Sequence, residues 1–454
     1  MEIGSQNNYL VAVIGAGPAG LYAAKQLASQ GVYVVLINRD IKPGGLAEYG
    51  IYHSKHKMKG GLRKQFRRIL EAPNIEYYGN LVVGKKGDLT LKELDALGFQ
   101  AVLVTVGAQG TKWLGLPGED LVGVYHAKDI VYHYNKLPPF SQKQFAIGKH
   151  VALIGVGNVM LDIARWLIRD VKVEQVTAVA RRGPKEVKFT KKEMESVARN
   201  LDLEALDDEI ERVAPLMEAV GQDAAAAKAF IHSALPKAQD PVSESCFTFE
   251  FLASPSRIIG GERGEVRGLE VEDTALVPKN GDTKAKRLGT KRILSVDTVI
   301  FCIGDRVDED FGLPVRWNEF VKSPEPRYPV QGNSYEAYDP EAERPVDRVF
   351  VAGWSREASS GLVGVARKDG ERGAQAVLQY LETQPPEESI SQVLAEFRSR
   401  LSRLAKKVVT KGDWQRLEAQ EQAEAEKLGL EEFKFASNQE MLEVIERPTP
   451  QPAD

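Results

Sequence analysis

Two glycine-rich turns, each placed directly after a short apolar run, constrain this sequence most. Residues 15–20 read Gly-Ala-Gly-Pro-Ala-Gly and follow apolar residues 10–14, and residues 155–158 read Gly-Val-Gly-Asn and follow apolar residues 151–154. Each pattern predicts a buried strand, a tight turn and the first turn of a helix, where free N–H groups and the helix dipole bind a pyrophosphate. One such turn also occurs as a packing device. Two of them predict an α/β fold with two Rossmann-like dinucleotide-binding domains.

The residues that follow each turn distinguish the two nucleotides. After the first turn, the strand predicted at residues 32–37 ends in Asn38, where an acidic residue often binds ribose hydroxyls and an amide still forms hydrogen bonds. After the second turn, the strand predicted at residues 176–180 ends in Arg181 and Arg182. Two guanidinium groups give a 2′-phosphate charge-assisted hydrogen bonds, so this site is predicted to bind NADP(H) rather than NAD(H). An exposed arginine pair on a solvated turn is the alternative.

The composition argues against several other kinds of site. The chain has 454 residues and a net charge of −4, which gives no whole-molecule case for binding nucleic acid. Its two cysteines, Cys246 and Cys302, lie far apart, so neither a dithiol centre nor a self-contained iron–sulfur cluster is expected, and Cys302 is predicted to be a small buried side chain. The histidines show no metal-binding spacing, so no metal is expected. Without a leader pattern or a long apolar run, the protein is expected to be cytoplasmic, with no transmembrane segment.

The order of the apolar runs predicts a discontinuous first domain. Residues 101–108 form a continuous apolar run typical of a buried parallel strand, and after the second glycine-rich unit further buried strands are predicted at residues 299–303 and 349–352. A unit that collects further strands after an insert is discontinuous. We therefore predict a first nucleotide-binding domain of residues 1–110 and 300–385, an inserted second domain of residues 111–299, and a C-terminal helical extension of residues 386–454. That extension begins at a Pro-Pro break and is predicted to form amphipathic helices at 390–409 and 414–428.

Further motifs follow one another along nearly the whole chain. They include Pro-Gly-Gly-Leu at 43–46, Gly-Asn-Leu-Val-Val-Gly at 79–84, Leu-Pro-Gly-Glu at 116–119, Tyr-Asn-Lys-Leu-Pro at 134–138, Arg-Arg-Gly-Pro at 181–184, Phe-Thr-Lys-Lys-Glu at 189–193, Phe-Leu-Ala-Ser-Pro at 251–255, Ala-Gly-Trp at 352–354 and Gly-Leu-Val-Gly at 361–364. With Trp414, Glu418, Glu421 and Lys434 in the tail, this order resembles adrenodoxin reductase and the bacterial ferredoxin–NADP⁺ reductases of the same type, which bind FAD and NADPH.

The resemblance implies cofactors and site residues for both domains. FAD would lie in the first domain, against Gly15, Gly17, Ala19, Gly20, Asn38, Gly45, Leu46, Val83, Gly107, Gly304, Gly353, Trp354, Gly361, Leu362 and Val363. NADP(H) would lie in the second, against Gly155, Val156, Gly157, Asn158, Val159, Arg181, Arg182 and Glu193, and also against Gly361.

Three of these side chains have a second interpretation. Trp354 either packs beside the flavin ring or is a core aromatic at a strand end. Glu193 either contacts NADPH or, in the pattern Thr190-x-x-Glu193, closes a helix capping box, and both roles can coexist. Asp162, the candidate catalytic residue, matches a family aspartate and either orients groups near the flavin or faces solvent on its helix.

The sequence departs from the family pattern in three places. Asn38 replaces the usual acidic residue, which puts the ribose contact in doubt. Residues 356–360 read Arg-Glu-Ala-Ser-Ser where the family often has Arg-Gly-Pro-Thr, so the loop after Trp354 is expected to sit differently. Residues 52–55 read Tyr-His-Ser-Lys in place of Ala-Pro-Asp-His, so no role of the family histidine is assigned to His53 or His56.

The resemblance implies that hydride moves between nicotinamide and flavin N5, and that the flavin exchanges electrons with a ferredoxin. A basic run, Lys55, Lys57, Lys59, Arg63, Lys64, Arg67 and Arg68, would dock an acidic ferredoxin or flavodoxin-like carrier, or would be only a solvated helix face. One alternative function is an FAD and NADPH oxidoreductase with a quinone or other small acceptor, or within a larger complex. Another is a non-catalytic nucleotide-binding protein.

Overall fold

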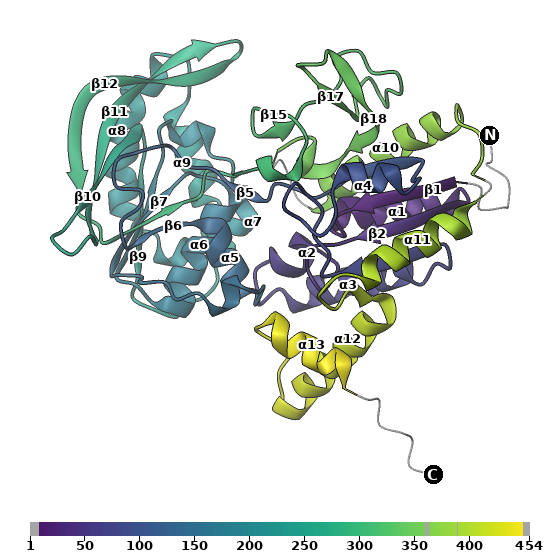
Figure 1. Cartoon of the computed structure of the whole chain (residues 1–454). Coiled ribbons are helices and arrows are strands. Elements are labelled where there is room, and N and C mark those ends of the chain that lie inside the picture. Colours follow the sequence, from purple (N-terminus) through teal and green to yellow (C-terminus); the bar gives the residue numbers. More distant parts are fainter. Residues whose placement is uncertain (1–8, 359–362, 388, 448–454) are drawn as a thin grey trace. The chain divides into compact units, whose positions relative to one another are not determined.

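The computed structural model describes residues 9–358, 363–387 and 389–447, and these divide into two compact units (Figure 1). The first unit contains residues 1–111, 132–142 and 304–454, and the second contains residues 112–131 and 143–303. The second unit lies within the predicted insertion, residues 111–299, except that it continues to residue 303 and leaves out residues 132–142. Residues 132–142 group with the first unit, and so do residues 386–454, which we predicted to form a C-terminal extension.

A seven-stranded sheet forms the centre of the first unit, in the order β17-β18-β4-β1-β2-β3-β19. The strands from β18 to β3 are parallel, and the two edge strands run antiparallel. Their bounds are β1 Tyr9–Ile14, β2 Val32–Ile37, β3 Ile75–Gly79, β4 Ala101–Val104, β17 Glu336–Asp339, β18 Arg344–Val351 and β19 Val409–Thr410. Since β1, β2 and β4 are almost wholly apolar, both faces of the sheet are buried.

Alternate residues of β1 point into two separate cores. Val11 and Val13 pack with the helices on one face, and Leu10, Ala12 and Ile14 pack on the other. Helices of the first face are α1 Pro18–Ser29, α3 His56–Leu70, α10 Val363–Leu381, α12 Lys411–Leu428 and α13 Asn438–Glu446. The second face is covered by α4 Leu91–Ala96 and α11 Ile390–Ser402.

The C-terminal residues join this unit because their apolar faces have a core to enter. Phe397 of α11 is 0% exposed and packs edge-on against Tyr78 and Phe99. Trp414 of α12 is buried in the other core. The helix predicted at residues 390–409 ends at Ser402, and Val409 instead pairs with Gly79 as an added edge strand.

The second unit is built on a five-stranded parallel sheet in the order β6-β13-β7-β8-β9. A three-stranded antiparallel sheet, β10-β11-β12, accompanies it. The strands are β6 Val124–His126, β7 His150–Ile154, β8 Gln175–Val179, β9 Cys246–Glu250, β10 Ala253–Gly260, β11 Val266–Lys279, β12 Asp282–Leu294 and β13 Thr298–Phe301. The helices are α6 Asn158–Trp166, α7 Lys191–Met194, α8 Leu203–Glu218 and α9 Ala224–His232, and Cys302 is buried as predicted.

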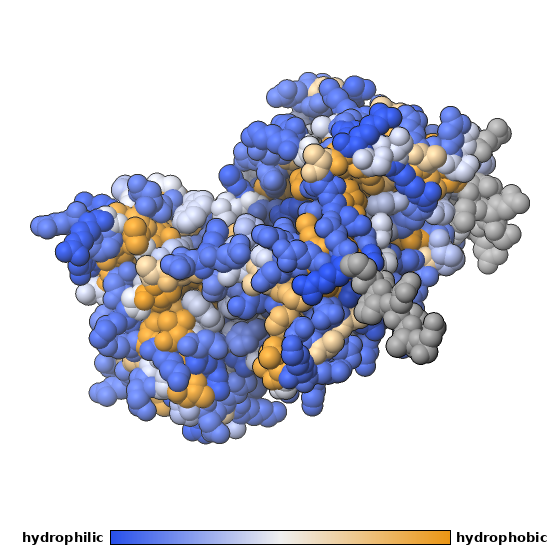
Figure 2. All heavy atoms as spheres, turned by 60° about the horizontal axis from the view of Figure 1, so that its bottom comes forward, coloured by the Kyte–Doolittle hydropathy of each residue, from blue (hydrophilic) through white to orange (hydrophobic). Residues whose placement is uncertain are grey.

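Short elements complete the two units. They are α2 Leu46–Tyr49, β5 Gly110–Thr111, β14 Asp305–Arg306, β15 Val315–Arg316 and β16 Glu319–Phe320, and α5 Ala127–Tyr134 contributes residues to both units. Hydrophilic residues predominate on the face in Figure 2, with apolar side chains gathered in patches. Within the described ranges, no helix combines the length and the apolar character that a bilayer crossing requires.

Candidate functional site

The first glycine-rich turn leads from β1 directly into α1. Gly15 has a φ of +106°, and its N–H donates to Ile37 O at 2.7 Å. A Cβ at Gly15 would lie 2.6 Å from Thr105 O, so only glycine fits between the strand ends. Gly17 caps α1 in an extended conformation and Pro18 follows at the start of the helix. The N-terminus of α1 is thus held at the carboxyl edge of the sheet, as predicted for a pyrophosphate site.

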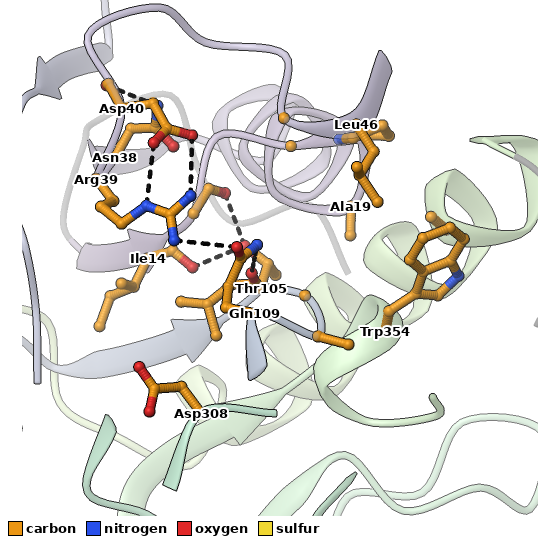
Figure 3. Close-up of a pocket in the computed structure, with 18 of the residues that line it drawn as sticks. Ile14, Ala19, Asn38, Arg39, Asp40, Leu46, Thr105, Gln109, Asp308 and Trp354 are labelled. Carbon is orange, nitrogen blue, oxygen red and sulfur yellow. Dashed lines mark hydrogen bonds and ion pairs between the residues drawn. The ribbon is translucent and has the colours of Figure 1, made fainter. Parts of the chain in front are cut away.

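A cleft of about 1080 Å³, including its part open to solvent, lies at this edge (Figure 3). Ten predicted FAD residues line it: Gly15, Gly17, Ala19, Asn38, Gly45, Leu46, Val83, Gly107, Trp354 and Val363. Three further predicted residues that the structure describes, Gly20, Gly304 and Gly353, are not among the lining residues. Gly361 and Leu362 lie outside the described residues.

Gly20 serves packing rather than the cleft. A Cβ at Gly20 would lie 1.9 Å from Gly15 O, so this glycine lets α1 start close to the turn. Gly370 of α10, which sequence reasoning missed, has the same role, since a Cβ there would lie 2.1 Å from Ala19 O. Helices α1 and α10 therefore cross at backbone contact beside the cleft.

The cleft fits an elongated dinucleotide such as FAD. Gly45 has a φ of +49°, and its Cβ would lie 2.9 Å from the Cα of Gly17, so bare backbone from two segments meets where a pyrophosphate would pass. Figure 3 shows polar residues Arg39 and Asp40 at one end and Leu46 and Trp354 at the other. A polar end suits ribose and adenine, and an apolar end suits a flat ring system.

The side chain of Asn38 is committed to the protein backbone. Its Oδ1 accepts from Ala16 N at 3.0 Å, and its Nδ2 donates to Asp40 O at 2.9 Å and to Lys42 O at 3.0 Å. The predicted ribose contact therefore does not follow from its side chain, because both amide hydrogens already have carbonyl partners. Other polar side chains at this end belong to residues that sequence reasoning missed. Arg39 donates to Asp40 and to Gln109, both at 3.0 Å, and all three line the cleft.

The second turn repeats the same geometry between β7 and α6. Gly155 has a φ of +121°, and a Cβ there would lie 2.6 Å from Cys302 O. Gly157 caps α6, and a Cβ on it would meet nothing within 4 Å, which leaves the helix N-terminus open. Asn158 Oδ1 accepts from Thr190 N at 2.8 Å, so it ties this turn to the start of α7. Val156 is half-buried and Val159 is 46% exposed.

The two arginines after β8 have different surroundings. Arg181 is exposed. Arg182 is half-buried, and its Nη1 lies 3.3 Å from an oxygen of Asp282 and donates to Thr283 O at 3.2 Å. The start of β12 therefore already holds one guanidinium, a contact that no sequence pattern predicted.

The roles of Glu193 and Asp162 stay predictions. Thr190 Oγ1 accepts from Glu193 N at 3.3 Å, so Thr190 supplies its half of the predicted capping box. Glu193 is half-buried at the start of α7, and Asp162 is half-buried on α6.

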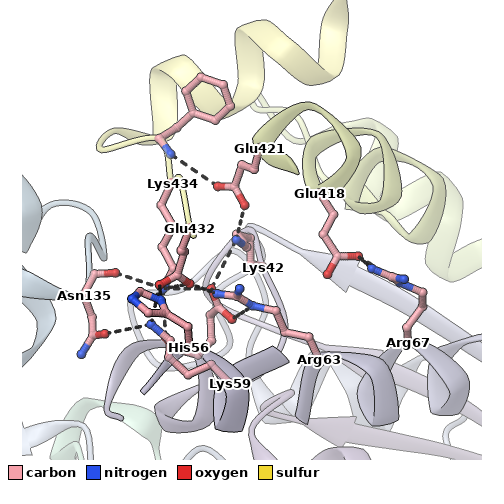
Figure 4. Close-up of polar contacts among 12 residues, drawn as sticks. Lys42, His56, Lys59, Arg63, Arg67, Asn135, Glu418, Glu421, Glu432 and Lys434 are labelled. Atoms are coloured by element: carbon pink, nitrogen blue, oxygen red, sulfur yellow. Dashed lines mark hydrogen bonds and ion pairs between the residues drawn. The ribbon is translucent and has the colours of Figure 1, made fainter. Parts of the chain in front are cut away.

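The basic run forms α3, but part of it faces the C-terminal helices (Figure 4). Lys59 is 1% exposed, and its Nζ lies 3.0 Å from a Glu432 oxygen. Arg63 binds both oxygens of Glu48 at 2.6 and 2.7 Å and also pairs with Glu432. Arg67 pairs with Glu418 at 3.0 Å. The predicted docking surface is therefore smaller than the basic run. Among its described residues, the exposed cations for which no ion pair is given are Lys57, Lys64 and Arg68, and Lys55 is half-buried.

Glu48, Lys59, Arg63 and Glu432 belong to one largely buried cluster, which also contains Lys42, Glu421 and Lys434. Lys42 pairs with Glu421 and lies 3.3 Å from Glu48, and Lys434 lies 2.9 Å from Glu48. Burial would raise the pKa of Glu48, but Lys42, Lys434 and Arg63 hold it well below its usual value. Burial lowers the pKa of Lys434 to about 7, against the opposing effect of Glu48. The cluster fixes residues 42–48, which carry Gly45 and Leu46, to the C-terminal segment.

Comparisons with known proteins agree with this geometry. Residues 9–204 match the family model described as pyridine nucleotide-disulphide oxidoreductase. The chain is 29% identical to the NADPH-ferredoxin reductase FprA of Mycobacterium leprae, over 96% of this chain and 98% of that protein. It is 26% identical to the mitochondrial NADPH:adrenodoxin oxidoreductase of Bos taurus, over 96% of this chain and 92% of that protein.

A solved structure gives the same result. Mycobacterium tuberculosis FprA in complex with NADPH aligns with a TM-score of 0.79 and 26% identity, over 96% of this chain and 99% of that one. The predicted fold class, with two dinucleotide-binding domains, and the predicted resemblance are both confirmed. The chain is thus similar over nearly its whole length to proteins named NADPH-ferredoxin reductase and NADPH:adrenodoxin oxidoreductase.

Proposed function

We propose that this protein moves electrons between NADP(H), bound in the second unit, and a ferredoxin-type one-electron carrier, by way of FAD bound in the first. The observation that supports this proposal most directly is the pair of glycine-rich turns. The turn at residues 15–20 borders a cleft large enough for a dinucleotide, and the turn at residues 155–158 is followed along the chain by the pair Arg181 and Arg182. FAD, when bound, supplies the step between two-electron hydride chemistry and one-electron release.

The protein's own part is to bind and orient. The open N-terminus of α6 would bind a pyrophosphate, and Arg181, exposed after the end of β8, would bind a 2′-phosphate. In the first unit, Gly15 and Gly17 hold the α1 N-terminus at the cleft edge, and Arg39 and Asp40 provide a donor and an acceptor at its polar end. The cytoplasmic location expected from the sequence stays a prediction.

The test of the proposal is carrier reduction with purified protein. With NADPH, we expect catalytic reduction of a ferredoxin, and with NADH we expect a much lower kcat/KM, because NADH has no 2′-phosphate for the arginine pair. A small dye serves as the acceptor control, since it accepts electrons without a docking surface. Rapid dye reduction with no reduction of any ferredoxin or flavodoxin would refute the carrier and favour a small-molecule acceptor.

The acidic partner is expected to use the exposed part of α3. Replacing Lys57, Lys64 and Arg68 with Glu should raise the KM for an acidic carrier while dye reduction stays unchanged. The effect should shrink as salt rises, because the Debye length falls from about 10 Å at 0.1 M to about 3 Å at 1 M. The matched control reverses Lys92, Arg344 and Lys427, which are exposed cations elsewhere in the same unit. Equal effects of the two triple variants would show that α3 is only a solvated face.

A further inference from the structure

A buried carboxylate gathers donors from the segments around Trp354. Asp369, on α10, is 7% exposed. It accepts hydrogen bonds from Gly353 N at 2.6 Å and from the Tyr335 hydroxyl at 2.9 Å. Arg356 donates to it through Nε at 3.0 Å and through Nη2 at 2.7 Å. The Asp369 side chain thus joins Gly353, in the turn after β18, to Arg356, which follows that turn, and to Tyr335, which precedes β17.

Arg356 is as well enclosed as its partner. It is 7% exposed, and its guanidinium carbon lies 4.7 Å from the centre of the Tyr335 ring. Burial and the neighbouring carboxylate raise the pKa of Tyr335, so its hydroxyl stays protonated and remains a donor. Because a buried charge is costly without its partner, Asp369 and Arg356 must remain together.

This pair adjoins three parts of the cleft wall. Trp354, in the turn Gly353–Ser355, and Ala366, on α10, both line the cleft. Gly353 has a φ of +69°, and a Cβ on it would lie 2.7 Å from the Cβ of Ala19, which lines the cleft as well. Asp369 accepts from the backbone N–H of this glycine, so it holds the turn at the residue whose backbone would otherwise have the most conformational freedom.

We propose that Asp369 and Arg356 are positioning residues that fix the turn Gly353–Ser355 and thereby set Trp354 against the ring end of the bound FAD. The proposal rests on the proposed function only in requiring FAD in this cleft. The proposal also predicts an effect on the midpoint potential of the flavin. Asp369 and Arg356 together carry no net charge, so replacing either one changes the charge next to the cleft. Asp369→Asn leaves the buried guanidinium of Arg356 with only the exposed carboxylate of Glu357, at 2.9 Å, as an anionic partner among the described residues. Arg356→Gln leaves the buried carboxylate of Asp369 without its cation.

The first measurement is FAD affinity of the full chain after removal of its flavin, arranged as a double-mutant cycle. Asp369→Asn and Trp354→Ala should each weaken FAD binding, on the order of tenfold for a lost contact of about 1.4 kcal/mol. The double variant should be little weaker than the worse single variant, since both changes remove the same contact. A purely structural role of Asp369 predicts instead that the two effects multiply. Tyr335→Phe removes one donor without unburying a charge, and it provides a milder variant should Asp369→Asn not fold.

The second measurement is the midpoint potential of the bound flavin. Asp369→Asn should raise it and Arg356→Gln should lower it, because reduction adds negative charge near the pair. Asp347→Asn, which neutralises a 75% exposed carboxylate of β18, is the control and should change neither quantity. Multiplying effects on FAD affinity, or shifts of the potential in the same direction, would overturn the proposal. If the parent chain itself binds no FAD, it is the proposed function that fails.

Discussion

Replacing Glu432 with Gln is expected to lower the free energy of unfolding at neutral pH by about 3 kcal/mol. This carboxylate is 12% exposed and lies between Lys59 at 3.0 Å and Lys434 at 3.7 Å, with Arg63 also paired to it. Burial alone would raise its pKa, but Lys434, Arg63 and Lys59 lower it from 4.5 to about 2. The substitution removes the carboxylate that lies 3.0 Å from Lys59, and it leaves Glu48 as the carboxylate that Arg63 and Lys434 share.

The same shift gives the loss a defined pH dependence. Since the folded-state pKa of Glu432 lies below the unfolded-state value, the unfolded chain binds more protons between the two. The stability that Glu432 contributes is therefore complete above pH 4.5 and is lost as the pH falls toward about 2. Urea unfolding at pH 7, 5 and 3.5 should show parent and Glu432→Gln converging as the solution is acidified.

The neighbouring residue supplies the control for this experiment. Glu431 is 79% exposed, and Glu431→Gln should change stability by less than about 0.5 kcal/mol at any of these pH values. A similar result for both variants would mean that the cluster contributes no more than surface charges do. A Glu432→Gln loss that persists unchanged at acidic pH would mean that packing, rather than charge, is responsible.

The largest effect on activity is expected from removing both arginines after β8. Each charge-assisted hydrogen bond to a 2′-phosphate is worth roughly 1.5–3 kcal/mol, so one arginine contributes on the order of 10- to 100-fold. The double variant, Arg181→Ala with Arg182→Ala, loses both contributions. It should therefore raise the KM for NADPH on the order of 100-fold or more, while the KM for NADH changes little.

The two arginines should not contribute equally. Arg182 is already paired with Asp282, so Arg182→Ala alone should cost less than Arg181→Ala. Asp282→Asn should lower the KM for NADPH, since it frees Arg182 and removes an anion near the phosphate. Steady-state kinetics with both nucleotides test this. An equal loss of NADPH and NADH activity would show that the pair supports the fold and does not select the phosphate.

The sequence predicted the strand-turn-helix units well because they depend on local patterns. Apolar runs and glycines at fixed spacing placed β1, α1, β7 and α6, and the reappearance of apolar runs after residue 299 indicated the insertion. The sheet β10-β11-β12 was missed. Strand β12 is largely exposed and rich in cations, so it lacks the alternation that marks a half-buried strand.

The polar contacts were harder to predict than the glycines. Asn38 was chosen for its place at the end of β2, yet its partners are carbonyls of a loop whose path the sequence does not specify. Lys59 and Arg63 read as a docking surface because their partners, Glu432 and Glu48, come from other segments of the chain. Asp369 lies within a helical pattern, and only the tertiary structure brings it to Gly353 N. Long-range ion pairs of this kind leave no periodic signal.

The most direct test of the account is the flavin content of the purified protein and its response to NADPH. We expect one noncovalent FAD per chain, released intact on denaturation, whose visible absorption is lost when NADPH is added without oxygen and is lost far more slowly with NADH. A flavin-free protein that does not take up FAD, or a bound flavin that NADPH leaves oxidised, would contradict the assignment of the cleft and of the electron path.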